Sequence, residues 1–300
     1  MRKSSAPAMH VGYVSLFSGA GIGCYGLSMA GFQCVATVEK NEKRLAIQKA
    51  NNKCEFPTGY ICGDVSDPRI QQQVVKEVAK WNNKDTNTNT LDVLIATPPC
   101  QGMSVCNHKK NNERERNSLA VSAIEMTLRL MPKVFIFENT SLFLKTKCTH
   151  PNGNLETIGA TIKDLLSPHY HIFPAERLNL KNYGGCSSRT RTIVIGTHKS
   201  VWFSPFSITP DWEEEVTLKK LIGDMPSLTR MGQVLEDDIY HSFKPYAKHM
   251  RNWIHNLPEG KSAFEQKNIK KRPHRFVNGV HIQNKNVNAD KYKRQKWQSV

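Results

Sequence analysis

Short apolar segments alternate with amphipathic ones through the first two hundred residues, and this alternation narrows the possible folds more than any other feature. The apolar segments, which predict strands, lie at residues 11–17, 33–38, 60–62, 91–97 and 133–137, with a later one that includes 191–196. The segments between them, which predict helices, lie at residues 24–30, 42–51, 68–81, 124–130 and 156–166. Strands that alternate with helices, without an internal repeat, predict an α/β fold with a doubly wound, mostly parallel sheet.

The alternation ends near residue 200, so we predict one domain over residues 1–200 and a different region over residues 201–300. The second region is basic. From Tyr240 to the C-terminus there are fourteen Lys and Arg against three Asp and Glu, within a chain of net charge +16. Such a block indicates a polyanionic partner, most simply nucleic acid. A solvated tail is the alternative.

Composition also limits the compartment. No stretch approaches the roughly twenty apolar residues of a membrane span, so we expect no membrane association. Residues 1–5 are not followed by the apolar region of a signal peptide. The eight cysteines show no disulfide-framework spacing, which suits the reduced thiols of a bacterial cytoplasm.

Cys100 follows the apolar segment 91–97 directly after two prolines. In open α/β sheets the chemistry gathers beyond the carboxyl ends of the strands. Proline fixes φ, so the thiol is expected on a stiff turn, where it could serve as a nucleophile. An inert buried cysteine is the alternative. Cys100, Cys106 and His108 match no common zinc spacing, so we expect no metal.

The glycine-rich segment 18–23 follows the first predicted strand and precedes a helix, an arrangement that lets backbone amides approach a ligand. Glu39 ends the next strand, where a carboxylate can accept hydrogen bonds from ribose hydroxyls. Asp64 ends the third strand and could accept from an exocyclic amine, while Phe17 could stack on a purine. Each acid alone could instead be a helix cap.

Glu138 ends the otherwise apolar strand 133–137. Burial disfavours its charge, so the carboxyl group is expected to be protonated or paired, and it could exchange a proton with a ring nitrogen. Arg189 and Arg191 precede the last apolar segment as an alternating pair. Their guanidinium groups are expected on one side of a strand, where they suit phosphate or carbonyl contacts. A solvated strand edge is the alternative.

Between Gly102 and Leu119 lies a highly charged stretch that includes residues 107–116. Most such stretches are ordinary surface loops. Because this one directly follows Cys100, it could also be a lid that closes over a substrate.

In this order, the motifs resemble those of the DNA cytosine-5 methyltransferase family. The matching segments are Leu16-Phe17-Ser18-Gly19-Ala20-Gly21, Glu39-Lys40-Asn41, Gly63-Asp64-Val65, Pro98-Pro99-Cys100-Gln101-Gly102-Met103-Ser104, Arg116-Asn117-Ser118-Leu119, Glu138-Asn139-Thr140 and Tyr183-Gly184-Gly185-Cys186-Ser187-Ser188-Arg189-Thr190-Arg191. Two departures stand out: Ser15 lies where the family usually has Asp, and Ser187 where it has Gln. The resemblance covers roughly residues 11 to 200.

The resemblance implies a Rossmann-like, class I methyltransferase fold and S-adenosyl-L-methionine as the cofactor. It implies that the Cys100 thiolate adds to C6 of a cytosine flipped out of duplex DNA, and that C5 then takes the methyl group. Glu138 would hold N3 and the exocyclic amine, and Arg189 the ring carbonyl with support from Arg191. Cofactor binding is assigned to Phe17, Gly19, Ala20, Gly21, Glu39, Asp64, Val65 and Pro99.

Two motifs that the family carries after its target-recognition region are not found in this sequence. One buttresses that region and the other completes the cofactor pocket. Residues 201–300 are therefore expected to hold only the start of a target-recognition region. A split enzyme, in which a small second subunit forms a heterodimer with this chain and supplies the missing motifs, is favoured over a truncated product.

The resemblance favours a bacterial restriction-modification system. A tRNA cytosine-5 methyltransferase is an alternative built on the same motifs, and a DNA-binding regulatory subunit that is inactive without its partner is another. Amino-methyltransferases carry Asp/Asn-Pro-Pro followed by an aromatic residue at this strand end. The thiol in Thr97-Pro98-Pro99-Cys100 argues against that class.

Overall fold

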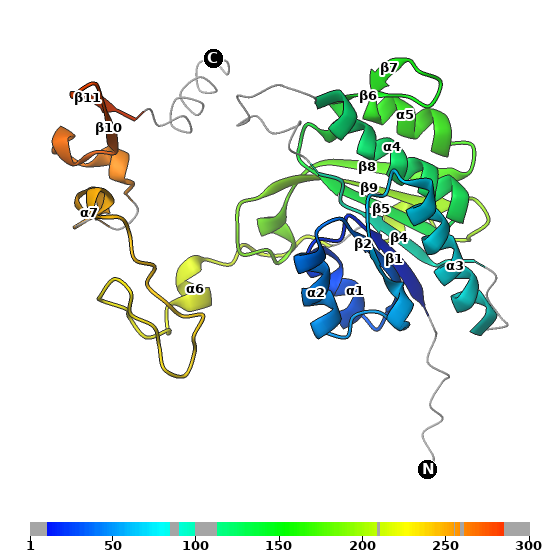
Figure 1. Ribbon diagram of the computed structural model, residues 1–300, viewed down its shortest axis with the longest axis horizontal. Helices are drawn as coiled ribbons and strands as arrows, with labels where there is room; N and C mark the ends of the chain where they lie inside the picture. The colour runs from blue at the N-terminus through cyan, green and yellow to red at the C-terminus, as the bar shows by residue number, and fades with distance from the viewer. Residues whose placement is uncertain are drawn as a thin grey trace, which may run out of the picture. The chain divides into compact units, whose positions relative to one another are not determined.

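A computed structural model of the protein describes residues 11–84, 90–99, 113–208, 211–254, 256–258 and 261–284. The main sheet has seven strands in the order β3-β2-β1-β4-β5-β9-β8 (Figure 1). The strands are β1 (Gly12–Leu16), β2 (Gln33–Glu39), β3 (Tyr60–Cys62), β4 (Val93–Ala96), β5 (Val134–Asn139), β8 (Tyr170–Asn179) and β9 (Thr190–His198).

The strands from β1 to β5 run parallel to one another. β1 pairs with β2 and β4, β2 with β3, and β4 with β5. β9 is antiparallel to β5, and β8 to β9. The predicted doubly wound, mostly parallel sheet is thus confirmed. Because the chain reverses its direction of travel across the sheet between β1 and β4, the carboxyl ends of these two strands form the switch point where such sheets bind ligands.

The helices beside this sheet are α1 (Tyr25–Met29), α2 (Glu42–Ala50), α3 (Pro68–Lys84), α4 (Glu113–Leu130) and α5 (Ile158–Leu166). Side chains just before two of them satisfy free amides of the first turn. Asn41 Oδ1 accepts from Arg44 N at 3.3 Å, and Thr157 Oγ1 accepts from Ala160 N at 3.2 Å. These caps explain why α2 and α5 begin where they do.

Consecutive residues of β1 point to opposite faces of the sheet and join different parts of the core. Val14 belongs to a buried cluster with Trp81 of α3 and Ile124 of α4. Tyr13 belongs to a second cluster, against which Leu27 of α1 packs. Figure 1 shows α4 and α5 on the side of the sheet away from α1 and α2. Apolar side chains on both faces explain why the strands read as continuous apolar runs.

The chain divides into two compact units, Met1–Leu221 and Ile222–Val300. The domain boundary predicted near residue 200 stays a prediction.

The remaining elements are β6 (Lys147–Thr149), β7 (Leu155–Thr157), α6 (Leu218–Ile222), α7 (Lys248–Ile254), β10 (His274–Val277), β11 (Val280–Gln283) and the 3₁₀ turns η1 (Ile22–Cys24), η2 (Pro57–Gly59), η3 (Phe143–Lys145), η4 (Leu180–Tyr183), η5 (Pro205–Ile208), η6 (Ala263–Glu265) and η7 (Ile269–Lys271).

In the second unit, β10 and β11 form an antiparallel hairpin. Asn278 and Gly279 join the strands with φ values of 50° and 75°, the left-handed conformation that a two-residue hairpin turn requires. Trp253 of α7 packs edge-on against His274, with ring centroids 5.7 Å apart. Within the described ranges, no helix is both long enough and apolar enough to span a membrane.

Candidate active site

The carboxyl edge of the parallel strands collects most of the residues that the sequence singles out. Phe17 directly follows β1, Glu39 ends β2, Asp64 follows β3, Pro99 follows β4 and Glu138 is the second-to-last residue of β5. They come from separate parts of the sequence, and the sheet order brings them to one edge. Cys100, the residue after Pro99, lies outside the described residues, as does the stretch 100–112.

A pocket of about 270 Å³ opens at this edge. Five of the eight residues predicted to bind a cofactor line it: Phe17, Glu39, Asp64, Val65 and Pro99. Gly19, Ala20 and Gly21 do not line it. The remaining lining residues, which the sequence reasoning did not assign, are Val38, Lys40, Arg44, Gly63, Thr97 and Leu119.

Glu39 joins the end of β2 to the glycine loop. Its side chain is buried, and Oε2 accepts from Gly19 N at 2.8 Å while Oε1 accepts from Asn41 N at 2.8 Å. An ionised carboxylate has about four acceptor positions. Two of them hold the loop, and the others are available to hydroxyl groups of a ligand in the pocket. Gly19 therefore contributes to the pocket indirectly, because its backbone amide positions the Glu39 carboxylate.

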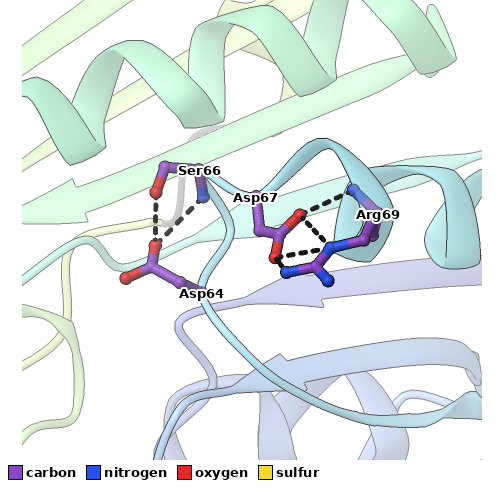
Figure 2. A network of polar contacts seen from close by, with 4 residues as sticks. All are labelled: Asp64, Ser66, Asp67 and Arg69. Carbon is purple, nitrogen blue, oxygen red and sulfur yellow. Dashed lines mark hydrogen bonds and ion pairs between the residues drawn. The ribbon is translucent and has the colours of Figure 1, made fainter.

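Asp64, which also lines the pocket, is held in its ionised form. Oδ2 receives a hydrogen bond from Lys40 Nζ at 2.9 Å, and Oδ1 receives bonds from Ser66 N and Oγ at 3.0 and 2.8 Å. Burial would raise the pKa of Asp64, but the contacts from Lys40 and Ser66 outweigh it and lower that pKa below 3.8. Figure 2 shows the bonds from Ser66 beside a separate Asp67–Arg69 pair.

Replacing Lys40 by alanine should raise the pKa of Asp64, since burial would then be opposed by Ser66 alone. The ionised form of Asp64 stabilises the folded chain above pH 3.8, and this contribution is lost as the pH falls through the lowered pKa. In the variant the loss should begin at higher pH. Carboxyl ¹³C NMR titration measures the shift, with Lys49→Ala, which replaces an exposed lysine of α2, as the control. An unchanged Asp64 titration in Lys40→Ala would contradict the assignment.

Phe17 adopts a backbone conformation that is costly for an aromatic residue, with φ of 56°. Thr97 stabilises this turn, because Thr97 Oγ1 donates to Phe17 O at 3.0 Å and Thr97 N donates to Leu16 O at 3.3 Å. Strained residues of this kind persist where the surroundings fix them, and they concentrate at functional sites. The strain places an aromatic ring on the pocket wall at the β1–β4 switch point.

A buried polar network supports the glycine loop from behind. Gln48 of α2 is only 1% exposed, and its Nε2 donates to Gly19 O at 2.7 Å and to Ser18 Oγ at 2.9 Å. Its Oε1 accepts from Thr37 Oγ1 and Lys53 Nζ, each at 2.8 Å. Two donors and two acceptors fill the hydrogen-bonding capacity of one amide side chain. The only sequence signal for Gln48 is a polar residue at a helix position that points inward.

Replacing Gln48 by leucine should lower the free energy of unfolding by about 3 kcal/mol, because it leaves several buried polar groups without their partner. Equilibrium urea unfolding measures this loss. The adjacent, exposed Lys49→Ala is the matched control and should change little. A Gln48→Leu protein as stable as the parent would show that water replaces the amide and that the network does not hold the loop.

Glu138 is paired, as its place at the end of an apolar strand predicts. Glu138 Oε1 lies 2.9 Å from Arg191 Nε, and the two side chains are 34% and 17% exposed. The pairing of β5 with β9 sets Glu138 opposite Ile193, so Arg191, two residues along β9, points to the same face. None of the described residues bonds to Glu138 Oε2, so this oxygen can receive a ligand.

Asn139 links this strand to the Pro98-Pro99 segment that precedes Cys100. It is buried, its Nδ2 donates to Pro98 O at 2.8 Å, and its Oδ1 accepts from Thr140 N at 2.8 Å. A single side chain therefore ties the end of β5 to the end of β4. The sequence reasoning gave Asn139 no separate role.

Arg189 differs from Arg191 in its surroundings. It precedes β9, its side chain is exposed, and its backbone is fixed by bonds from Leu180 N to Arg189 O (2.9 Å) and from Arg189 N to Ser187 O (2.8 Å). Of the two arginines, only Arg191 forms an ion pair with Glu138 among the described residues. The role predicted for Arg189 stays a prediction. Among these residues there is also no group of three or more His, Cys, Asp or Glu that could hold a metal ion.

Comparisons with known proteins point to one family. The pattern of the family described as C-5 cytosine-specific DNA methylase matches residues 11–299. Type II methyltransferase M1.HgaI of Avibacterium volantium is 30% identical over 84% of this chain and 66% of its own length. M.XorII of Xanthomonas oryzae pv. oryzae is 27% identical over 75% of the chain and 49% of its own length. The chain thus spans about half to two thirds of these relatives.

A solved structure shares the fold. It is a prophage-encoded protein of E. coli, described as a DNA modification methyltransferase, with a TM-score of 0.53 and 23% identity. The match covers 75% of this chain and 58% of that one.

Proposed function

Because the chain belongs to the C-5 cytosine-specific DNA methylase family, we propose that it transfers a methyl group from S-adenosyl-L-methionine to C5 of cytosine in duplex DNA, as part of a restriction-modification system. The observation that carries the proposal is the convergence at one sheet edge. There Pro99 lines a pocket with acidic and aromatic walls, and Asn139, which follows the paired Glu138, bonds to Pro98.

The lining residues fit the adenosine part of this cofactor. Glu39 has acceptor positions left for the two ribose hydroxyls, and ionised Asp64 can accept from the adenine amine. Phe17 supplies an aromatic face for the purine, and Val65 and Leu119 supply apolar contacts. The volume of about 270 Å³ is close to the lower limit of about 300 Å³ for ligand pockets. When bound, the cofactor supplies an electrophilic methyl group on a sulfonium.

Cys100 would act as the nucleophile. Cytosine C5 is too weak a nucleophile to take a methyl group directly. Addition of the Cys100 thiolate to C6 converts the ring into an enamine-like species whose C5 can attack the methyl group. Loss of the C5 proton and elimination of Cys100 then release 5-methylcytosine. The base must leave the stack to reach this site.

Glu138 would hold the ring while charge develops on it. With Oε1 paired to Arg191, Oε2 can meet N3 and the exocyclic amine of the cytosine. A proton shared between Glu138 and N3 prevents a build-up of negative charge on the ring as the thiolate adds. Arg191 fixes the carboxylate in place, and Arg189 is proposed to reach the ring carbonyl.

Methyl transfer from labelled cofactor to defined substrates tests this proposal. We expect label in duplex DNA that lacks cytosine methylation, recovered as 5-methylcytosine after digestion to nucleosides. Label recovered as N4-methylcytosine or N6-methyladenine would contradict the chemistry. Label in tRNA with none in DNA would agree with methylation at cytosine C5 but would show that the substrate is tRNA.

A further inference from the structure

Two cysteines outside the active site lie close enough to react with one another. Cys34 in β2 and Cys54 after α2 form a parallel bridge, and their sulfur atoms are 3.6 Å apart. Cys34 is buried and Cys54 is partly exposed. The Cys54 thiol donates to the Cys34 sulfur, and in its thiol form Cys34 donates onward to Ala36 O at 3.6 Å.

The surroundings hold this pair together and favour a reactive sulfur. A Cβ on Gly59 would lie 3.2 Å from Cys54 Cβ and 2.6 Å from Val35 O. Only a glycine therefore allows η2 to pack this closely against Cys54 and β2. Burial would raise the pKa of Cys34, but the Cys54 thiol and the Lys53 ammonium outweigh it and lower that pKa. The same contact raises the pKa of Cys54. Cys34 therefore carries the thiolate character of the pair.

We propose that Cys34 and Cys54 form a redox-modification site, at which an oxidant of the peroxide class converts the two thiols into a reversible disulfide. Because Cys54 is the more exposed sulfur, it is the one that peroxide reaches. Cys34 takes the proton of the Cys54 thiol along the contact between the two sulfurs, and the Cys54 sulfur attacks peroxide. The O–O bond breaks, which gives a sulfenic acid on Cys54 and, with one solvent proton, one water. The Cys34 sulfur then attacks the Cys54 sulfur. The S–S bond forms as the S–O bond breaks, and the oxygen leaves as water with the Cys34 proton. Two thiols are oxidised and one peroxide is reduced to two waters.

The backbone geometry permits this bond. Paired strands lie about 4.8 Å apart, within the Cα separation of about 4.4–6.8 Å that disulfides allow. The sulfur atoms must close from 3.6 Å to about 2.05 Å, a movement of roughly 1.5 Å. Cys54 follows the end of α2, where such a shift is easier than inside the sheet. The exposed Cys62 has no cysteine at comparable distance among the described residues.

Peptide mapping of the full chain tests the site. In a Cys100→Ser background the protein is treated with hydrogen peroxide, alkylated in denaturant and digested with trypsin. One tryptic peptide carries Cys24 and Cys34, and another carries Cys54 and Cys62. We expect these two to be linked, with fragment ions that place the bond on Cys34 and Cys54 and with loss of the link after dithiothreitol.

Two variants sharpen the result. Cys54→Ser should abolish the link, while Cys62→Ser, which removes the neighbouring exposed thiol, should leave it intact. A bond to Cys24 or Cys62, or free Cys34 and Cys54 after other thiols have been oxidised, would overturn the proposal.

The disulfide would also act on the pocket, a consequence that rests on the proposed function. Residues 34–54 include Glu39, Lys40 and Arg44, and Lys53 bonds to Gln48 behind the glycine loop. Movement of Cys54 draws Lys53 away from Gln48, so oxidation should weaken S-adenosylmethionine binding several-fold in calorimetric titration of the protein with Cys100 replaced. The effect should be absent in Cys54→Ser.

The outcomes separate the two proposals. If the protein binds S-adenosylmethionine equally well before and after oxidation, the proposed effect on the pocket is overturned, while the mapped disulfide stands. If the reduced protein binds no S-adenosylmethionine, the proposed cofactor is overturned, and so is the proposed effect of the disulfide on its binding.

Discussion

Replacing Cys100 by serine should lower kcat for methylation of DNA by about 10⁴-fold or more. A serine hydroxyl is not ionised near neutral pH, so the addition to C6 that activates C5 would be lost. A factor of 10⁴ corresponds to about 5.4 kcal/mol of transition-state stabilisation. Cofactor affinity should change little, because Glu39, Asp64 and Phe17 supply the pocket contacts. Single-turnover rates and calorimetric titration measure the two quantities.

Cys62→Ser is the matched control for this result. Its thiol is exposed, does not line the pocket, and lies at the end of β3. It should retain close to the parent rate. A Cys100→Ser protein with a rate within tenfold of the parent would show that another group activates the base.

Replacing Glu138 by glutamine should lower kcat by about 10²–10⁴-fold. Glutamine keeps the shape of the side chain but cannot exchange a proton with N3, so charge develops on the ring as Cys100 adds. It also leaves Arg191 without its carboxylate partner. Because both side chains are partly exposed, water can solvate Arg191, and the fold should be retained. Rapid-quench methylation assays and thermal unfolding measure the two effects.

Glu214→Gln provides the control for Glu138→Gln, since Glu214 is exposed in the segment before α6. It should leave the rate unchanged. If Glu138→Gln methylates DNA as fast as Glu214→Gln does, Glu138 does not take part in the proton exchange.

The sheet could be predicted from the sequence because its signals are local. The predicted strand 60–62 matches β3, and the strand 33–38 matches β2 to within one residue. Apolar runs between helices report burial on both faces, which is what the central strands of a parallel sheet require. The small β6–β7 pair was not predicted, because its strands, Lys147–Thr149 and Leu155–Thr157, are mostly polar and form no apolar run.

The site could be predicted only in part. Residues that end strands, such as Glu39 and Asp64, are marked by position alone, since the carboxyl ends of parallel strands meet at one edge. Arg44 and Gln48 lie inside α2, and their contact with the site depends on how that helix packs on β2. The pattern of a helix gives its inward face but not the groups that this face meets.

Two tertiary contacts show the same limit. Arg189 and Arg191 look equivalent in sequence, yet only Arg191 lies on a strand paired with β5, and it alone of the two meets Glu138 in the described structure. Asn139 sits beside Glu138 in a motif, but its bond to Pro98 O depends on the pairing of β4 with β5. Both contacts follow from register, which a single sequence does not specify.

Covalent trapping tests the central claim most directly. Duplex DNA in which 5-fluorocytosine replaces cytosine is incubated with the protein and S-adenosylmethionine. Because fluorine cannot leave C5 as the proton does, elimination of the thiol is blocked after methyl transfer. The account predicts a denaturant-resistant protein–DNA adduct that peptide mapping assigns to Cys100 and that Cys100→Ser cannot form. No adduct, or an adduct on any other residue, would contradict it.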